Sequence, residues 1–137
     1  MSKSKPIISS HDRDQLMPLI DSARLDSRVS LENLIVLERE LTRADVVPPG
    51  EVPPDVVTMN SVVTFRDLAT GEEESYTLVY PRDADLLQDR ISIFAPIGTA
   101  LLGYRVGDVI EWRVPAGKRR LEITEVRHPS VEPLVHA

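Results

Sequence analysis

Apolar residues near the start of this chain recur at the spacing of one helix face. They form two groups, Leu16, Leu19, Ile20 and Ala23, and then Leu31, Leu34, Leu37 and Leu41. Residues 25–30 between the groups are typical of a turn, and the second helix is expected to extend to about residue 44. The pattern predicts two short amphipathic helices that form an antiparallel hairpin, a short coiled coil with a single leucine seam.

Short polar side chains mark the beginnings of both predicted helices. A side-chain oxygen there can accept from the free N–H groups of the first turn. The candidates are Ser9, Ser10 and Asp12 for the first helix and Ser30 for the second. Pro18 lies inside the first helix and removes one backbone hydrogen bond, so a kink is expected there.

A proline-rich stretch at 46–55 then interrupts the helical pattern. It holds four prolines within seven residues, which favours an extended and stiff connector. The sequence therefore predicts a helical hairpin over 1–45, a linker over 46–55 and a second domain over 56–137, with a loose tail from about 128. In the alternative reading, the two helices pack on the second domain as ordinary core helices. The polar residues 1–9 are expected to be frayed.

From residue 56 the apolar period becomes two, as in a half-buried strand. Val63 and Phe65 alternate with polar residues, and a turn at 69–72 leads to a second alternating run, which predicts a β-hairpin. A last strand is predicted over 121–126, where the alternation slips after Ile123 in the manner of a β-bulge.

The stretch 91–114 predicts a strand, a short helix, a tight turn and another strand. Pro96 suits the first position of the helix, and Gly103 suits a left-handed residue at its end. The second half is thus a small, mostly antiparallel sheet of about five strands with one short helix, and the whole chain is α+β. One helix leaves part of the sheet uncovered, so apolar surface remains for the hairpin or a partner.

Composition narrows the class of protein. Hydrophobic residues make up 42 %, and there is no cysteine for a disulfide or a thiolate metal site. No apolar run approaches the roughly 20 residues that span a bilayer, and the first residues lack the apolar segment of a signal peptide. The composition predicts a soluble, cytoplasmic protein without a membrane contact.

Charge points to a protein partner. The net charge is −6, and neither half of the chain is basic: residues 1–50 carry 7 basic and 8 acidic groups, and residues 51–137 carry 9 and 14. Binding to nucleic acid draws most of its affinity from basic groups on phosphate, so no direct nucleic-acid binding is expected.

The sequence holds no convincing active site. Residues 98–103 have the glycine spacing of a phosphate loop but continue with Tyr104 and Arg105 in place of Lys and Ser or Thr. Three aspartates at 83–89 lack the glycine and the closing glutamate of a calcium loop, and the histidines have no metal-ligand spacing. We expect neither a cofactor nor a metal, and no catalytic residues.

Several strings resemble the Rnk branch of the Gre-like bacterial proteins, the regulators of nucleoside diphosphate kinase. They lie at 55–61, 76–81, 95–103 and 106–108. The resemblance implies an FKBP-like fold for the C-terminal domain and an antiparallel coiled coil at the N-terminus. It also implies that the C-terminal domain binds RNA polymerase near the secondary channel.

In the Gre factors, an acidic residue or Asn, a Ser and a Pro just before the short helix contact the rim of that channel. The matching residues here are Phe94, Ala95 and Pro96, of which only Pro96 is kept. Phe94 can serve as an apolar anchor at an interface, or it can be a core residue.

The residues at the hairpin tip determine whether the resemblance implies stimulation of transcript cleavage. Gre factors carry a pair of acids there, which hold Mg²⁺ in the polymerase active site, and their helical arms are longer. Here Asp26 and Glu32 are too far apart to match the pair, and Arg28 lies between them. We therefore expect polymerase binding as a monomer, in competition with Gre factors, without stimulation of transcript cleavage.

Two other functions stay open. The family name suggests a regulator that acts directly on nucleoside diphosphate kinase or on nucleotide metabolism. The FKBP-like fold suggests a prolyl isomerase, although a chain with two Phe and one Trp offers little to line an aromatic pocket.

Overall fold

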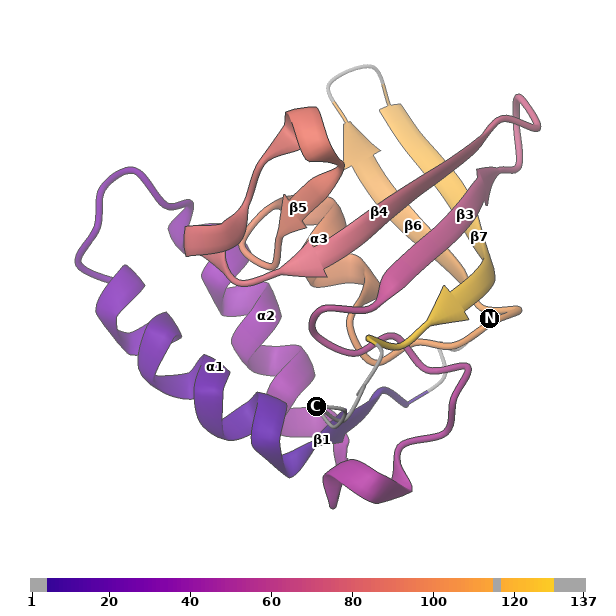
Figure 1. The fold of residues 1–137 in the computed structure, drawn as a ribbon. Coiled ribbons are helices and arrows are strands. Elements are labelled where there is room, and N and C mark those ends of the chain that lie inside the picture. Colours follow the sequence, from indigo (N-terminus) through magenta and orange to yellow (C-terminus); the bar gives the residue numbers. More distant parts are fainter. Residues whose placement is uncertain (1–4, 115–116, 130–137) are drawn as a thin grey trace.

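The computed structural model describes residues 5–114 and 117–129. They form a helical hairpin packed beside a five-stranded sheet, with a two-stranded sheet at the base of the hairpin (Figure 1). The helices are α1 (Ser10–Ala23), α2 (Leu31–Arg43) and α3 (Pro96–Leu101). The strands are β1 (Ile7–Ser9), β2 (Asp45–Val47), β3 (Val62–Asp67), β4 (Glu73–Val79), β5 (Arg90–Ser92), β6 (Val109–Val114) and β7 (Gly117–Arg127). Three 3₁₀ turns complete the described chain: η1 (Pro49–Glu51), η2 (Pro81–Asp83) and η3 (Leu86–Gln88).

The predicted hairpin is confirmed, with caps at the expected residues. The Ser9 hydroxyl accepts from the N–H of Asp12 at 3.0 Å, and the Ser30 hydroxyl accepts from the N–H of Asn33 at 3.2 Å. Helix α1 continues through Pro18, which lies on its exposed side. Leu16 and Ile20 on the opposite side are fully buried, and this packing outweighs the loss of one backbone hydrogen bond.

The expectation of a frayed start is wrong for residues 7–9. They form β1, which pairs in parallel with β2, so the strand before α1 lies beside the strand after α2. Ile8 is only 2 % exposed, and the Ile7 N–H donates to the Gly103 carbonyl at 3.0 Å. Three residues are too short to show a period of two, which is why the pattern missed this strand.

The strand order of the main sheet is β5-β4-β3-β7-β6. Strands β4 and β5 pair in parallel and the other neighbours are antiparallel, so the sheet is mixed. The β3–β4 hairpin is confirmed, and Gly71 in its turn has a φ of 80°. The predicted bulge is confirmed as well, because Thr124 is the extra residue between the partners of Thr64 and Phe65.

The stretch 91–114 folds as predicted, into β5, α3 and β6. Pro96 is the first residue of α3, and Gly103 has a φ of 87° just after the helix. A Cβ at Gly98 would lie 2.3 Å from the carbonyl oxygen of Ser92, so this glycine lets α3 pack directly on the backbone beside β5. This close contact fixes the turn between β5 and α3.

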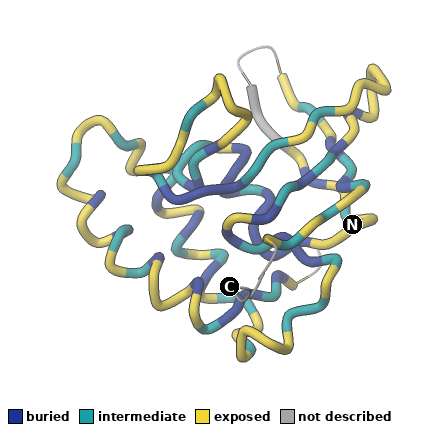
Figure 2. The backbone as a smooth tube through the Cα atoms, viewed as in Figure 1, coloured by how far each residue is buried: buried dark blue, intermediate teal, exposed yellow. Residues whose placement is uncertain are grey.

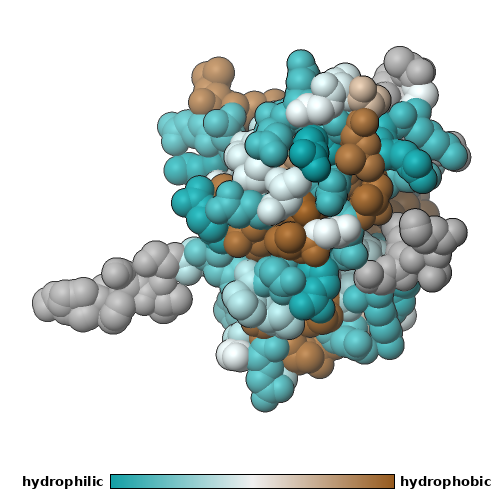
Figure 3. Space-filling view, turned by 90° about the vertical axis from the view of Figure 1, so that its right-hand side faces the viewer, coloured by the Kyte–Doolittle hydropathy of each residue, from teal (hydrophilic) through white to brown (hydrophobic). Residues whose placement is uncertain are grey.

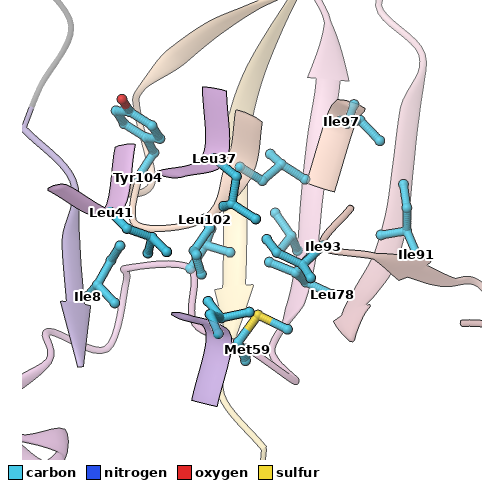
Figure 4. Packing of buried hydrophobic residues seen from close by; sticks show 14 of the residues in the cluster. Ile8, Leu37, Leu41, Met59, Leu78, Ile91, Ile93, Ile97, Leu102 and Tyr104 are labelled. Atoms are coloured by element: carbon cyan, nitrogen blue, oxygen red, sulfur yellow. The ribbon is translucent and has the colours of Figure 1, made fainter. Parts of the chain in front are cut away.

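One hydrophobic cluster joins the hairpin to the sheet. Leu37 and Leu41 of α2 point toward Leu102, Met59 and Leu78 in the interior (Figure 4). The buried positions concentrate between the helices and the sheet, and the outer sides of the helices are exposed (Figure 2). The alternative reading therefore holds for the helices, which pack on the sheet as core elements. The FKBP-like character of the sheet and the coiled-coil character of the hairpin stay predictions.

Polar contacts hold the same junction. The Tyr104 hydroxyl donates to the Glu40 carboxylate and accepts from Arg43 Nη1 at 3.3 Å. At the start of α1, also at the base of the hairpin, Asp12 Oδ2 accepts from the N–H of Met59 at 3.1 Å. Both helices are thus attached to the sheet domain by polar contacts at the base of the hairpin.

The side of the molecule that faces away from the hairpin is mainly hydrophilic, with patches of hydrophobic surface between the polar side chains (Figure 3). None of the helices in the described part of the chain has both the length and the apolar character to cross a membrane.

Candidate functional site

The turn between β5 and α3 holds Phe94, Ala95 and Pro96, and we call it the docking turn. Two hydrogen bonds to Ser92 shape it: the Phe94 N–H donates to the Ser92 hydroxyl, and the Ala95 N–H donates to the Ser92 carbonyl, both at 2.9 Å. Phe94 and Ala95 are half-buried and Pro96 is exposed. The docking turn therefore presents apolar surface from a fixed backbone.

Asn33 of α2 attaches the hairpin to the docking turn. Its Nδ2 donates to the Phe94 carbonyl at 2.5 Å and to the Thr99 hydroxyl at 3.0 Å. The Thr99 hydroxyl in turn donates to the Ile93 carbonyl at 2.7 Å. No local pattern singles out Asn33, because its partners lie more than 60 residues away in the chain.

A groove runs between the hairpin tip and the docking turn, and we call it the tip groove. It has a volume of about 380 Å³. It is lined by Leu19, Ser22, Ala23, Asp26, Val29, Pro81, Arg82 and Phe94. Two residues that the sequence analysis placed in separate sites, Asp26 and Phe94, therefore share one groove. Ala95, Pro96 and Arg28 are not among its lining residues.

The carboxylate of Asp26 is fully engaged by Arg28. Asp26 Oδ1 accepts from the backbone N–H of Arg28 at 2.9 Å and from its Nε at 3.0 Å, and Oδ2 accepts from Nη2 at 3.0 Å. These bonds hold the pKa of Asp26 below its usual value. In the described part of the chain, no cluster of three or more acidic or histidine side chains is placed to hold a metal ion. At the hairpin tip, the negative charge of Asp26 is thus balanced by the positive charge of Arg28.

Arg82 lies at the rim of the tip groove. Its guanidinium is 5.6 Å from the centre of the Tyr80 ring, and its Nε is 3.9 Å from Asp83 Oδ2. The Arg82 side chain is 75 % exposed. Its charge is therefore held only loosely by its neighbours in the described structure.

A second groove of about 390 Å³ lies at the start of α1, bordered by Asp12, Met59, Tyr80 and His128 among others. Burial raises the pKa of Asp12, and it raises the pKa of Tyr80 to about 12. Within the described residues the buried Tyr80 hydroxyl has no hydrogen-bond partner. His11 is exposed, and His128 Nε2 lies 2.7 Å from the Val56 carbonyl oxygen. Among the described residues, the tip groove is lined by one phenylalanine, Phe94, and the second groove by one tyrosine, Tyr80.

Comparison with known families accounts for almost the whole described chain. Residues 52–128 match the family described as transcription elongation factor GreA/GreB, C-terminal, and residues 7–47 match the family described as Rnk N-terminus. The border between the two matches falls within the predicted linker.

Individual relatives agree with these matches. The "Regulator of nucleoside diphosphate kinase" of Escherichia coli K12 is 40 % identical over 129 residues, which cover 93 % of each chain. A "Transcription elongation factor GreA" of Clostridium botulinum is 38 % identical over 106 residues, 77 % of this chain and 66 % of that protein. A solved structure, the "Prokaryotic transcription elongation factor GreA/GreB from Nitrosomonas europaea", is 47 % identical, covers 92 % of this chain and 100 % of that one, and superposes with a TM-score of 0.76. The chain belongs to the GreA/GreB transcription elongation factor family, in the branch that carries the Rnk N-terminal segment.

Proposed function

We propose that this protein is a transcription regulator, without enzymatic activity of its own, that binds RNA polymerase at the rim of the secondary channel. The docking turn makes the contact, with Phe94 as an apolar anchor where Gre factors use polar groups. Its half-buried, hydrogen-bonded backbone supports this role, because a contact surface that is already ordered loses little entropy on binding. Membership of the GreA/GreB family supports polymerase as the partner.

The protein occupies the channel without stimulating transcript cleavage. The observation that carries this proposal is the ion pair at the hairpin tip, where the Arg28 guanidinium donates hydrogen bonds to both oxygens of the Asp26 carboxylate. A Mg²⁺ ion needs carboxylate oxygens that are free to coordinate it. Helix α2 has 13 residues, which correspond to a length of about 20 Å. Its apolar side packs in the core between the hairpin and the sheet. The protein therefore competes with Gre factors for the same rim.

The experiment is a binding titration with purified RNA polymerase. The Phe94→Asp variant places a charge in the docking turn, and we expect it to weaken binding about tenfold or more, as for an anchor residue of an interface. Leu68→Asp is the matched control, since Leu68 is 45 % exposed and directly follows the last residue of β3. Binding of Phe94→Asp equal to that of the control would remove the docking turn from the interface.

The name of the Escherichia coli relative supports a second candidate, direct regulation of nucleoside diphosphate kinase. This function requires a stable complex with the kinase or a change in its rate. Purified kinase assayed with and without the protein distinguishes the two functions, because we expect no change in rate at protein concentrations that saturate polymerase.

A further inference from the structure

We infer that the tip groove receives an apolar side chain of the polymerase, and that Arg82 binds a carboxylate next to that side chain on the same segment. This inference rests on the proposed function, and it adds the chemistry of the partner surface. The contact extends from the docking turn across the groove to the hairpin tip, so the two parts of the molecule form one binding surface.

The walls of the tip groove are mostly apolar. Leu19, Ala23 and Val29 come from the hairpin, and Pro81 and Phe94 face them from the sheet domain. An open groove lined by apolar side chains leaves apolar surface in contact with water. A groove of about 380 Å³ between apolar side chains is therefore surface that a partner side chain can bury.

The walls are held apart at a fixed spacing. Asn33 ties α2 to the Phe94 carbonyl on one side. At the tip, the Val29 N–H donates to the Asp26 carbonyl at 3.0 Å. The ion pair between the Asp26 and Arg28 side chains stabilises the same turn. A groove that does not need to form on binding is a favourable receptor for a single side chain.

The charges around the tip groove favour an acidic residue beside the partner's apolar side chain. The Asp26 carboxylate is neutralised by Arg28, so it repels an acidic partner little. The Arg82 side chain is 75 % exposed, and its ion pair with Asp83 is long, with Nε 3.9 Å from Oδ2, beyond hydrogen-bond length. A guanidinium in this state can form two parallel hydrogen bonds with a carboxylate. The partner segment therefore carries an apolar residue beside an Asp or a Glu.

The test compares variants that fill the groove or change its charge, using purified RNA polymerase as the ligand. Ser22 lines the groove and is exposed, so Ser22→Trp fills the space from outside, and Ser22→Ala is its matched control. We expect Ser22→Trp to weaken binding about tenfold and the control to bind within about twofold of wild type. Arg82→Glu should weaken binding at least as much as Ser22→Trp. Arg82→Lys keeps the positive charge but loses the planar guanidinium that forms two parallel hydrogen bonds, so its affinity should lie between those of wild type and Arg82→Glu.

Each outcome decides between the two proposals. Wild-type protein that does not bind polymerase contradicts the proposed function and removes the partner named here. If Phe94→Asp binds weakly while Ser22→Trp and Arg82→Glu bind like wild type, the docking turn stands and the groove contact is wrong. Sedimentation of the free protein tests a second copy as the occupant: a dimer that Ser22→Trp dissociates would contradict the assignment. Arg82 is exposed, so Arg82→Glu keeps the test valid if Ser22→Trp does not fold.

Discussion

Two aspartates of the hairpin show how local surroundings decide what a carboxylate can do. Asp26 is at the tip and its pKa is lowered, first by the side-chain hydrogen bonds from Arg28 and then by the backbone hydrogen bond. Asp12 is buried at the base, and its desolvation outweighs the hydrogen bonds from Met59 and Ser9, so its pKa is raised. Sequence could name Asp26 as a tip residue, but its pairing with Arg28 follows from the shape of the turn.

Replacing Asp12 by Asn should stabilise the fold at neutral pH. A raised pKa in the folded state means that the stability contributed by the protonated form is present below the ordinary pKa of 3.8 and is lost as pH rises through the folded value. The Asn side chain keeps an acceptor for the Met59 N–H and carries no buried charge. Urea unfolding at several pH values measures the effect: the gain should be present at pH 7 and vanish in acid, and a loss of stability at pH 7 would contradict the account. Asp14→Asn, on the exposed side of the same helix, is the control.

Replacing Gly98 by Ala tests the close contact behind the docking turn. The added Cβ would lie 2.3 Å from the Ser92 carbonyl oxygen, a backbone atom that cannot move aside. We expect a loss of about 1–3 kcal/mol of unfolding free energy, typical of overpacking in a core. Gly50→Ala is the matched control, because its Cβ would meet nothing within 4 Å. Equal stability of the two variants in thermal unfolding would show that the contact is not rigid.

At the scale of elements, pattern predicted most of the fold. Helix periodicity placed α1 and α2, alternation placed β3 and β4, and a slip in alternation after Ile123 located the bulge. Strands β1 and β2 were missed because each has three residues and their pairing joins segments that are far apart in the chain. The tip groove could not be predicted either, since it forms where the hairpin meets residues 81–82, a contact that no local pattern encodes.

The junction between α2 and the docking turn depends on Asn33. Asn33→Ala removes two hydrogen bonds and leaves the Phe94 carbonyl without this donor. We expect a loss of about 1–3 kcal/mol in unfolding free energy, since unmade hydrogen bonds at a partly buried site carry that cost. Hydrogen exchange should rise around the docking turn more than elsewhere. Glu32→Ala, the exposed neighbour in the chain, is the control, and an equal effect of both variants would contradict the role of Asn33.

At the scale of the whole molecule, the shared core makes the hairpin and the sheet one cooperative unit. Leu37→Ala should destabilise the protein by about 2–5 kcal/mol, because Leu37 is 1 % exposed within the cluster that joins α2 to the sheet. Helical circular dichroism and the near-ultraviolet signal of Tyr76, in β4, should report the same unfolding midpoint before and after the change. Two separated transitions would mean that residues 1–45 fold independently, as the proline-rich segment first suggested. Leu25→Ala, at a side chain that is 92 % exposed, is the control.

The resemblance to Gre factors and the geometry of the hairpin tip combine into one account of the whole molecule. Asn33 of the hairpin is hydrogen-bonded to the docking turn, and the hairpin ends in the ion pair between Asp26 and Arg28. These two features underlie the proposal that the protein fills the binding site of a Gre factor without supplying the metal-binding acids.

The most direct measurement is transcript cleavage in stalled elongation complexes to which a fixed amount of a Gre factor and increasing amounts of this protein are added. We predict that the protein alone produces no cleavage, that it lowers Gre-dependent cleavage as its concentration rises, and that Phe94→Asp fails to lower it. Cleavage that stays at the Gre level at saturating protein, or that increases when the protein is added alone, would contradict the account.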